Sequence, residues 1–403
     1  MGQEPSSAEL ERILTQMREQ PTKIAPSDRR AKFTNKERIR EQLGASGLAA
    51  IIVMAPENVP YFSGYFNADI VAASRENPNI IVWPVQGEPV YICRALKPGQ
   101  QNIDPFIRDI RVYARWTSPM KHLADVITER GWSKSQLGIE KNFFPVGNFE
   151  ELIGLVGPGV KFVDCRNLIS EIKMVKTPAE IQLLRFAART TEKAIRITYE
   201  MTRPGDTEKS VADMLGYAIT RLGADKPGSN IVASAERTVQ GHHTAEDVIL
   251  KVGDLFRVDY GGIFSGYLTD MARTAVVGQS SENQRSIYEK IWIIHQAMLA
   301  GIHPGAIPHQ LVAKALKQYD DAGMPPNRSF FGHGIGLSVH EEPSIRINNQ
   351  HPLEQNMILC IENGWSDESI PERYHIEDMI LVTERGFELL TNYAPTDQLF
   401  VMG

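Results

Sequence analysis

The chain has 403 residues, of which 42% are hydrophobic and 23% charged, as is usual for a globular protein with room for two domains. Its formal net charge of -6 gives no general attraction to nucleic acid or to anionic membranes, and no run of about 18 apolar residues indicates a membrane-spanning helix. The three cysteines, Cys93, Cys165 and Cys360, are too scattered for a disulfide framework. We therefore expect buried, reduced thiols and, because the N-terminus lacks a signal-peptide core, a cytoplasmic location.

The first 35 residues predict a polar N-terminal arm, with a helix over 7–19 followed by a linker rich in proline and charge. We interpret this arm as an accessory or dimer-packing segment. From residue 36 to 168, apolar strand-like runs alternate with helical stretches, which predicts a small α/β domain. The expected strands are 49–54, 79–83 and 89–93, and the expected helices are 36–45, 120–131 and 147–156.

The remaining residues, 169–403, predict a second domain that opens with a well-marked helix start. Thr177 can cap this helix, Pro178 suits its first position, and Glu180 completes a capping box. We expect the helix to run to about Tyr199.

The turn after this helix recurs about a hundred residues later. Pro204-Gly205 and Pro304-Gly305 each follow a long helix and precede another, the second of which begins near Ile307. The recurrence predicts an internal duplication, with ligands where the two halves meet. The alternative is that Pro-Gly merely ends helices often.

The segment 258–270 predicts a hairpin that presents two acids. Ser265-Gly266 forms the expected turn between Asp259 and Asp270. If the strands pair symmetrically about this turn, Asp259 faces Ala272, and Asp270 lies on the same face at a diagonal distance of roughly 7–8 Å. One metal ion can bridge such a pair. The alternative is two solvated acids beside an exposed turn.

Further candidate ligands follow downstream in or beside strand-forming runs. These are His333 in G-H-G-I-G, Glu362 in C-I-E-N-G and Glu377 in H-I-E-D. A buried, unpaired carboxylate is too costly to be accidental. Four carboxylates and one imidazole carry a formal charge of minus four, which two divalent cations would cancel. This oxygen-rich set suits Mn, Fe, Co or Zn, and none of the three cysteines is needed.

The glycines around His333 indicate close approach rather than a nucleotide-binding loop. Gly332, Gly334 and Gly336 would let backbone and substrate approach where a Cβ would obstruct them. The dinucleotide fingerprint is excluded because its G-x-x-G spacing is missing and strand-forming residues follow instead of a helix.

The order, residue types and spacings resemble those of the creatinase, prolidase, aminopeptidase P and methionine aminopeptidase family, whose catalytic domain is called the pita-bread fold. The resemblance covers about residues 170–395, and a weaker match to the family's N-terminal domain extends it to about residue 35. It implies an α+β protein in which a smaller creatinase-type α/β domain precedes a pita-bread catalytic domain with pseudo-twofold duplication. It also implies a homodimer.

The resemblance assigns roles to individual residues. In the family, five matching residues bind a pair of divalent metals, for which we expect Mn, with Co, Zn or Fe as alternatives. Glu362 also matches the residue that passes the proton from the bridging water, and His340 and His242 match histidines that contact the substrate or the tetrahedral intermediate. The five metal ligands carried over are Asp259, Asp270, His333, Glu362 and Glu377.

The substrate is less well defined. Proline-specific members usually carry Arg two positions before the last metal Glu, where this chain has His375, and the nearest arginine is Arg373. Either side chain could bind the carboxylate of a dipeptide. We expect a metallopeptidase that removes the N-terminal residue from Xaa-Pro or other short peptides. The alternatives are a hydrolase or lyase of a small compound of the ectoine, creatine or dimethylsulfoniopropionate type, and a noncatalytic binding module.

Overall fold

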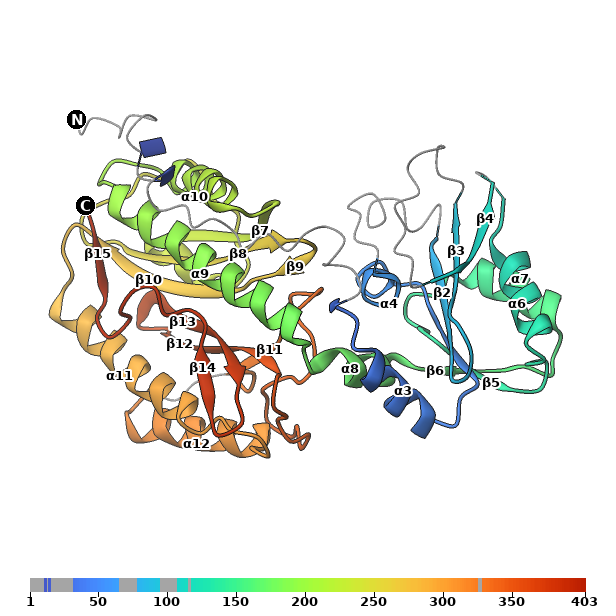
Figure 1. The fold of residues 1–403 in the computed structure, drawn as a ribbon. Coiled ribbons are helices and arrows are strands. Elements are labelled where there is room, and N and C mark those ends of the chain that lie inside the picture. The colour runs from blue at the N-terminus through green and yellow to red at the C-terminus, as the bar shows by residue number, and fades with distance from the viewer. Residues whose placement is uncertain are drawn as a thin grey trace. The chain divides into compact units, whose positions relative to one another are not determined.

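The computed structural model describes residues 11–12, 14–15, 32–64, 78–94, 107–114, 117–324 and 328–403, which belong to two compact units (Figure 1). One unit lies within Ile24–Glu180, and the other contains Ile181–Gly403. Most of the predicted N-terminal arm lies outside the described residues, although the Glu11 carboxylate accepts a hydrogen bond from Arg221 Nη2 at 2.9 Å. Among the described residues, no helix combines the length and apolar character needed to cross a membrane.

The first unit is an α/β domain built on a mixed sheet. Its described strands follow the order β4-β3-β2-β1-β5-β6, in which β1 pairs with β2 antiparallel and with β5 parallel. The three strands and three helices predicted for this region are all confirmed. The strands are β1 Ala50–Val53, β2 Ile80–Pro84, β3 Val90–Arg94, β4 Asp109–Tyr113, β5 Gln136–Ile139 and β6 Lys161–Asp164. The helices are α3 Lys36–Ala45, α4 Val59–Ser63, α6 Met120–Glu129, α7 Val146–Val156 and α8 Arg166–Met174.

The apolar runs that predicted these strands form the core of this unit. Ile52, Val82 and Ile92 from neighbouring strands are fully buried in one cluster with Leu123 of α6 and Leu152 of α7. Central strands buried on both faces read as continuous apolar sequence, which is why short apolar runs, rather than a period of two, identified them.

The predicted capping box at the start of α9 (Pro178–Met201) is confirmed. Thr177 Oγ1 accepts a hydrogen bond from the Glu180 amide at 3.2 Å, and a Glu180 carboxylate oxygen accepts one from the Thr177 amide at 2.7 Å. Two amides that the helix itself leaves without partners are therefore satisfied. The helix continues two residues beyond the predicted end at Tyr199.

The second unit contains two sheets that meet where β10 contacts β13 (Figure 1); all their strand pairs are antiparallel except β10 with β15, which is parallel. One sheet has the order β15-β10-β8-β7, with β9 paired to β8, and the other has the order β11-β12-β13-β14. Helix α10 packs on β7 of the first sheet, and α11 packs on β12 and β13 of the second. The strands are β7 Lys226–Ser234, β8 Leu255–Phe264, β9 Tyr267–Leu268, β10 Met271–Val277, β11 Gly332–Gly334, β12 Ile358–Asp367, β13 Ile370–Val382, β14 Phe387–Leu389 and β15 Phe400–Met402. The helices are α10 Glu208–Leu222, the 3₁₀ turn η1 Ala235–Val239, α11 Glu282–Leu299 and α12 Pro308–Asp321.

The two halves of this unit repeat one arrangement, as the Pro-Gly turns predicted. Gly205 lies between α9 and α10 and donates to Leu250 O at 2.9 Å, and Gly305 lies between α11 and α12 and donates to Leu353 O at 2.7 Å. Each leucine returns a hydrogen bond to the residue after its glycine, at 2.8 Å and 2.9 Å respectively. Both glycines have positive φ, 101° and 86°. Equivalent contacts at equivalent positions support a duplication rather than two unrelated helix ends.

Candidate metal centre

The hairpin of β8 and β10 has the predicted register. Ala272 pairs with Asp259, and the turn residues Ser265 and Gly266 have φ values of 53° and 88°. Two consecutive residues with positive φ are what a tight hairpin turn requires for the natural twist of its strands. Asp259 and Asp270 therefore lie at neighbouring positions of one hairpin, with Asp270 directly before β10.

The second hairpin contributes the two glutamates. Glu362 of β12 pairs directly with Glu377 of β13, so both side chains project from the same face of the sheet. On the other side of β12, His333 of β11 pairs with Cys360, which precedes Glu362 by two residues and so shares its face. Strand pairing alone thus places one imidazole, one thiol and two carboxylates on one surface.

The glycines beside His333 allow close contacts of the backbone, as predicted. A Cβ on Gly332 would lie 2.1 Å from Cys360 O, and a Cβ on Gly334 would lie 2.4 Å from Glu342 O. Any larger residue at either position would push β11 away from its neighbours. The position of His333 relative to β12 therefore depends on these glycines.

The predicted ligands lie close together. His333 Nε2 is 3.6 Å from Glu377 Oε1 and 3.9 Å from Asp270 Oδ2. The ligand atoms of Asp259 and Glu377 lie within 4.8 Å of each other, together with one from His375. Glu362 joins this group through His375, whose Nε2 is 3.1 Å from Glu362 Oε2.

Two buried carboxylate oxygens of this group lack partners. Among the described residues, neither Asp270 Oδ1 nor Glu377 Oε1 has a hydrogen-bond partner, although Asp270 is 6% exposed and Glu377 only 2%. Burial, and then the neighbouring carboxylates, raise the pKa of both groups well above their ordinary values. Divalent cations would supply the missing partners, so the donor set fits metal ions.

Glu362 has a different environment. Burial alone would raise its pKa, but the hydrogen bond from His375 and the charge of Arg328 outweigh burial and hold the pKa well below its ordinary value. Arg328 Nη2 lies 2.7 Å from Glu362 Oε2. Within one cluster, the pKa values of Asp270 and Glu377 are therefore raised whereas that of Glu362 is lowered.

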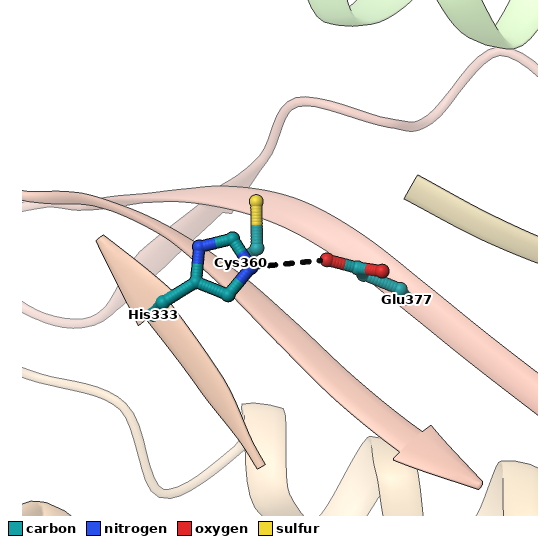
Figure 2. A group of neighbouring side chains, drawn as sticks. All are labelled: His333, Cys360 and Glu377. Carbon is teal, nitrogen blue, oxygen red and sulfur yellow. Dashed lines mark ion pairs between the residues drawn. The ribbon is translucent and has the colours of Figure 1, made fainter. Parts of the chain in front are cut away.

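The sequence analysis missed Cys360 and Arg328. Cys360 is fully buried, and its sulfur lies with ligand atoms of His333 and Glu377 in a group that spans no more than 4.8 Å (Figure 2). Burial, and then the neighbouring Glu377, raise the pKa of this thiol well above its ordinary value. Because Cys360 precedes Glu362 by two residues, the spacing could have indicated that its thiol lies on the same face of β12 as Glu362, which we call the metal face. No comparable local signal marks Arg328.

His340 lies at the edge of the cluster. Its ring is exposed and meets the His333 ring edge to face, with centroids 4.4 Å apart. Partial burial, and then the nearby His333, lower the pKa of His340. His242 is also exposed and close enough for its charge to contribute to this lowering. The two histidines are thus placed beside the cluster rather than inside it.

Arg373 and His375 lie on the same face of β13 as Glu377, since the three residues alternate along one strand. His375 is buried, whereas Arg373 is partly exposed. Burial, and then the charge of Arg328, lower the pKa of Arg373. Burial likewise lowers the pKa of Arg257, to about 10, although its Nη1 is 3.5 Å from Asp259 Oδ2. Three guanidinium groups therefore surround one end of the carboxylate cluster.

The chain is similar to known metallopeptidases over both units. Residues 182–384 match Metallopeptidase family M24, and residues 36–175 match the Creatinase/Prolidase N-terminal domain. The chain is 31% identical to the Xaa-Pro dipeptidase of Pyrococcus furiosus over 63% of this chain and 73% of that protein. It is 26% identical to the Xaa-Pro dipeptidase of Lactobacillus delbrueckii subsp. lactis over 89% of this chain and 96% of that protein.

Solved structures agree with these matches. The prolidase from Pyrococcus horikoshii OT3 superposes with a TM-score of 0.75 at 26% identity, over 89% of this chain and 98% of that chain. The predicted α+β class, with a creatinase-type domain before a pita-bread domain, is confirmed. The match at residues 182–384 spans half of the chain and includes all five residues predicted as ligands. The chain therefore belongs to metallopeptidase family M24 and is a hydrolase whose family membership implies divalent metal ions.

Proposed function

We propose that this metallopeptidase holds two divalent metal ions and removes the N-terminal residue from Xaa-Pro or other short peptides. The observation that supports it most directly is the convergence of four carboxylates and His333 around buried oxygens that lack partners. The proposed ligands are Asp259, Asp270, His333, Glu362 and Glu377. We propose Mn as the metal, with Co, Zn or Fe as alternatives.

Two metal ions held by these side chains would acidify a water molecule and polarise the carbonyl of the peptide bond. Glu362 is suited to accept the proton from that water, because Arg328 and His375 keep its carboxylate ionised. The same carboxylate then returns the proton to the leaving amine. Arg328 and His375 hold Glu362 in place during both transfers, since each forms a hydrogen bond with the same oxygen, Oε2.

His340 and His242 would donate hydrogen bonds to the developing oxyanion or to the substrate amide. Both lie on the exposed side of the cluster, where a substrate can reach them. Arg373 would bind the carboxylate at the C-terminal end of a dipeptide; His375, the other candidate for this role, is buried and already hydrogen-bonded to Glu362. Burial is the main cause of the lowered pKa values of Arg257 and Arg373, and an anionic substrate group would stabilise both buried cations.

Hydrolysis of matched dipeptides tests this function. Protein reconstituted with Mn is incubated with Xaa-Pro beside Xaa-Ala, with the same preparation of Asp270→Asn as the blank. We expect turnover of dipeptides by the parent alone, and turnover confined to Xaa-Pro would identify a prolidase-type enzyme. If protein that contains two metals per chain hydrolyses none of the peptides, the peptidase proposal fails in favour of a small-molecule hydrolase or lyase.

Replacing His340 with alanine should separate rate from metal binding. The ring contacts His333 but lies outside the cluster of carboxylates, so we expect the metal content after dialysis to be unchanged. Loss of one oxyanion donor should lower kcat by about 100- to 1000-fold. His303→Ala, which removes an exposed imidazole in the turn between α11 and α12, serves as the control and should change neither the metal content nor kcat. A His340→Ala protein that loses its metal would show that His340 supports metal binding instead.

The resemblance carries three further proposals about the whole protein. We propose a homodimer, a cytoplasmic location, and a division into an arm over 1–35, an N-terminal domain over 36–168 and a catalytic domain over 169–403. The three cysteines are free and buried, as expected for a reducing compartment. Sedimentation velocity measures the oligomeric state, and limited proteolysis locates the domain limits.

A further inference from the structure

His375 occupies a position from which it can reach the metals directly. It precedes Glu377 by two residues on β13 and pairs with Gly364 of β12, so its ring projects from the metal face of the sheet. Residue 364 has no side chain, and a Cβ there would lie 2.8 Å from Tyr374 O and 3.4 Å from His375 Cδ2, so the glycine allows the two strands to pair closely beside the ring. His375 is only 2% exposed.

The hydrogen bonds of the ring leave one nitrogen available. His375 Nε2 lies 3.1 Å from Glu362 Oε2, and this carboxylate oxygen also accepts from Arg328 at 2.7 Å. The imidazole therefore donates from Nε2, which leaves a lone pair on Nδ1. Among the described residues, His375 Nδ1 has no hydrogen-bond partner, and it is 3.7 Å from Asp259 Oδ2. The ligand atoms of Asp259, His375 and Glu377 all lie within 4.8 Å of one another.

His333 provides an internal comparison in the same site. Its Nδ1 lies 3.0 Å from Gly334 O and donates to that carbonyl, so its lone pair is on Nε2, which faces Asp270 and Glu377. Histidines that bind metals usually donate their second ring N–H to a carboxylate or carbonyl, which fixes the orientation of the ring. His375 has the same arrangement with the two nitrogens exchanged.

The backbone of His375 is also held rigidly. Thr274 Oγ1 accepts a hydrogen bond from the His375 amide at 2.8 Å and donates one to the His375 carbonyl at 2.9 Å. Thr274 belongs to β10, in the sheet whose β8 strand carries Asp259. Because β10 and β8 pair directly, Thr274 fixes His375 relative to Asp259, as a preformed metal site requires.

We propose that His375 is a sixth metal ligand, which binds through Nδ1 on the Asp259 side of the centre, opposite His333. This inference rests on the proposed function only in requiring two metal ions per chain. It gives each ion one imidazole nitrogen in addition to carboxylate oxygens. Imidazole suits Zn, Fe and Ni, whereas an oxygen-only site suits Mn, so His375 raises the affinity for Zn relative to that for Mn on the Asp259 side, while the carboxylates there still accept the Mn proposed above.

Two substitutions at His375 separate metal binding from the hydrogen bond to Glu362. In His375→Gln, the amide nitrogen replaces Nε2 and can still donate to Glu362, but no nitrogen remains at the position of Nδ1. In His375→Asn, the amide replaces Nδ1 and offers an oxygen towards Asp259, but the bond to Glu362 is lost. A substrate-binding role for His375 predicts a higher KM in both variants with unchanged metal binding.

The first measurement is the number of metals per chain after loading with Zn²⁺ and gel filtration, together with affinity from competition with a chelator. We expect two ions in the parent. In His375→Gln the weaker site should lose more affinity than the roughly 10- to 100-fold that loss of a ligand's outer hydrogen-bond partner costs, and His375→Asn should retain more affinity than His375→Gln. Competition between Zn²⁺ and Mn²⁺ should show a smaller preference for Zn²⁺ in His375→Gln than in the parent.

X-ray absorption of the zinc-loaded proteins counts the imidazoles directly. The parent should show one imidazole per zinc on average, and His375→Gln about half as many. An average of one-half in the parent, or equal affinity in the parent and His375→Gln, would overturn the assignment of His375. Fewer than two ions in the parent would instead contradict the dinuclear centre of the proposed function, so the two failures are distinguishable.

Discussion

Asp270→Asn is expected to abolish peptide hydrolysis and leave the fold intact. The substitution keeps the size and shape of the side chain but removes one of the four carboxylates around His333, whose Nε2 is 3.9 Å from Asp270 Oδ2. Without this proposed ligand we expect the centre to lose metal, and kcat should fall by about 1000-fold or more, a change of about 4 kcal/mol in the barrier. The measurement is dipeptide hydrolysis by equal amounts of parent and variant.

The stability of the metal-free protein gives a second test of Asp270→Asn, in which the variant should equal or exceed the parent. Burial and the charge of Glu377 raise the pKa of Asp270, which means that its charge is unfavourable in the folded protein without metal. Asn at this position removes that cost, so the metal-free variant should unfold at the same temperature as the parent or higher. Added metal should then stabilise the parent strongly and the variant little, because only an ion that binds the native state raises its stability.

Asp247→Asn is the matched control, since Asp247 is an exposed carboxylate of the same unit. This variant should match the parent in activity, in melting temperature and in its response to metal. Hydrolysis by Asp270→Asn at the rate of the parent would place the metal centre elsewhere. A variant that fails to fold would show that Asp270 is needed for packing.

Arg273→Met is expected to produce the second large effect, a fall in the stability of the protein. Arg273 is buried and lies between two acids, with Nη2 2.9 Å from Glu192 Oε1 and 2.7 Å from Asp378 Oδ1. Its Nη1 also donates to Glu377 O at 2.6 Å, which ties the network to the strand that carries a proposed ligand. Methionine fills a similar volume but leaves both acids buried without their cation. We expect the free energy of unfolding to fall by about 3–5 kcal/mol, as measured by urea denaturation.

Asp378 makes this effect dependent on pH. Burial opposes the ionised form of Asp378, but Arg273 and then His295 outweigh burial and hold its pKa well below the ordinary value. A depressed pKa contributes stability above the pKa of the unfolded chain, about 3.9, and the contribution is lost as the pH falls through the folded value. The difference between parent and Arg273→Met should therefore be full near pH 7 and shrink below about pH 4.

Lys317→Met is the control for removing a cation from an exposed pair. Lys317 Nζ is 2.7 Å from Asp321 Oδ2 on the surface of α12, with side chains that are 74% and 64% exposed. Such pairs contribute less than about 1 kcal/mol. If Arg273→Met lowers the free energy of unfolding no more than Lys317→Met does, the buried network contributes specificity of packing rather than stability.

Local rules were sufficient for much of this protein. The hairpin of β8 and β10 was predictable to the residue because a tight turn at Ser265-Gly266 determines which residues pair on either side. The start of α9 followed from Thr177 and Glu180, whose side chains satisfy amides within one turn of the helix. The positions of the five proposed ligands depended on order and spacing along the chain, and their resemblance to a family supplied the expected roles.

Only the tertiary structure revealed how the surrounding side chains are used. Arg328 reaches Glu362 from a segment outside the strands, and the hydrogen bond of His375 to Glu362 decides which of its nitrogens is available. These relations depend on distances between residues far apart in the chain, which neither spacing nor periodicity encodes. By itself the sequence determined several helices and strands and the register of one hairpin, because those follow from local geometry, and its order and spacing supplied the candidate ligands. The tertiary structure decided which charges neighbour each carboxylate and which atoms lack partners, because burial and charge depend on the packing of the whole unit.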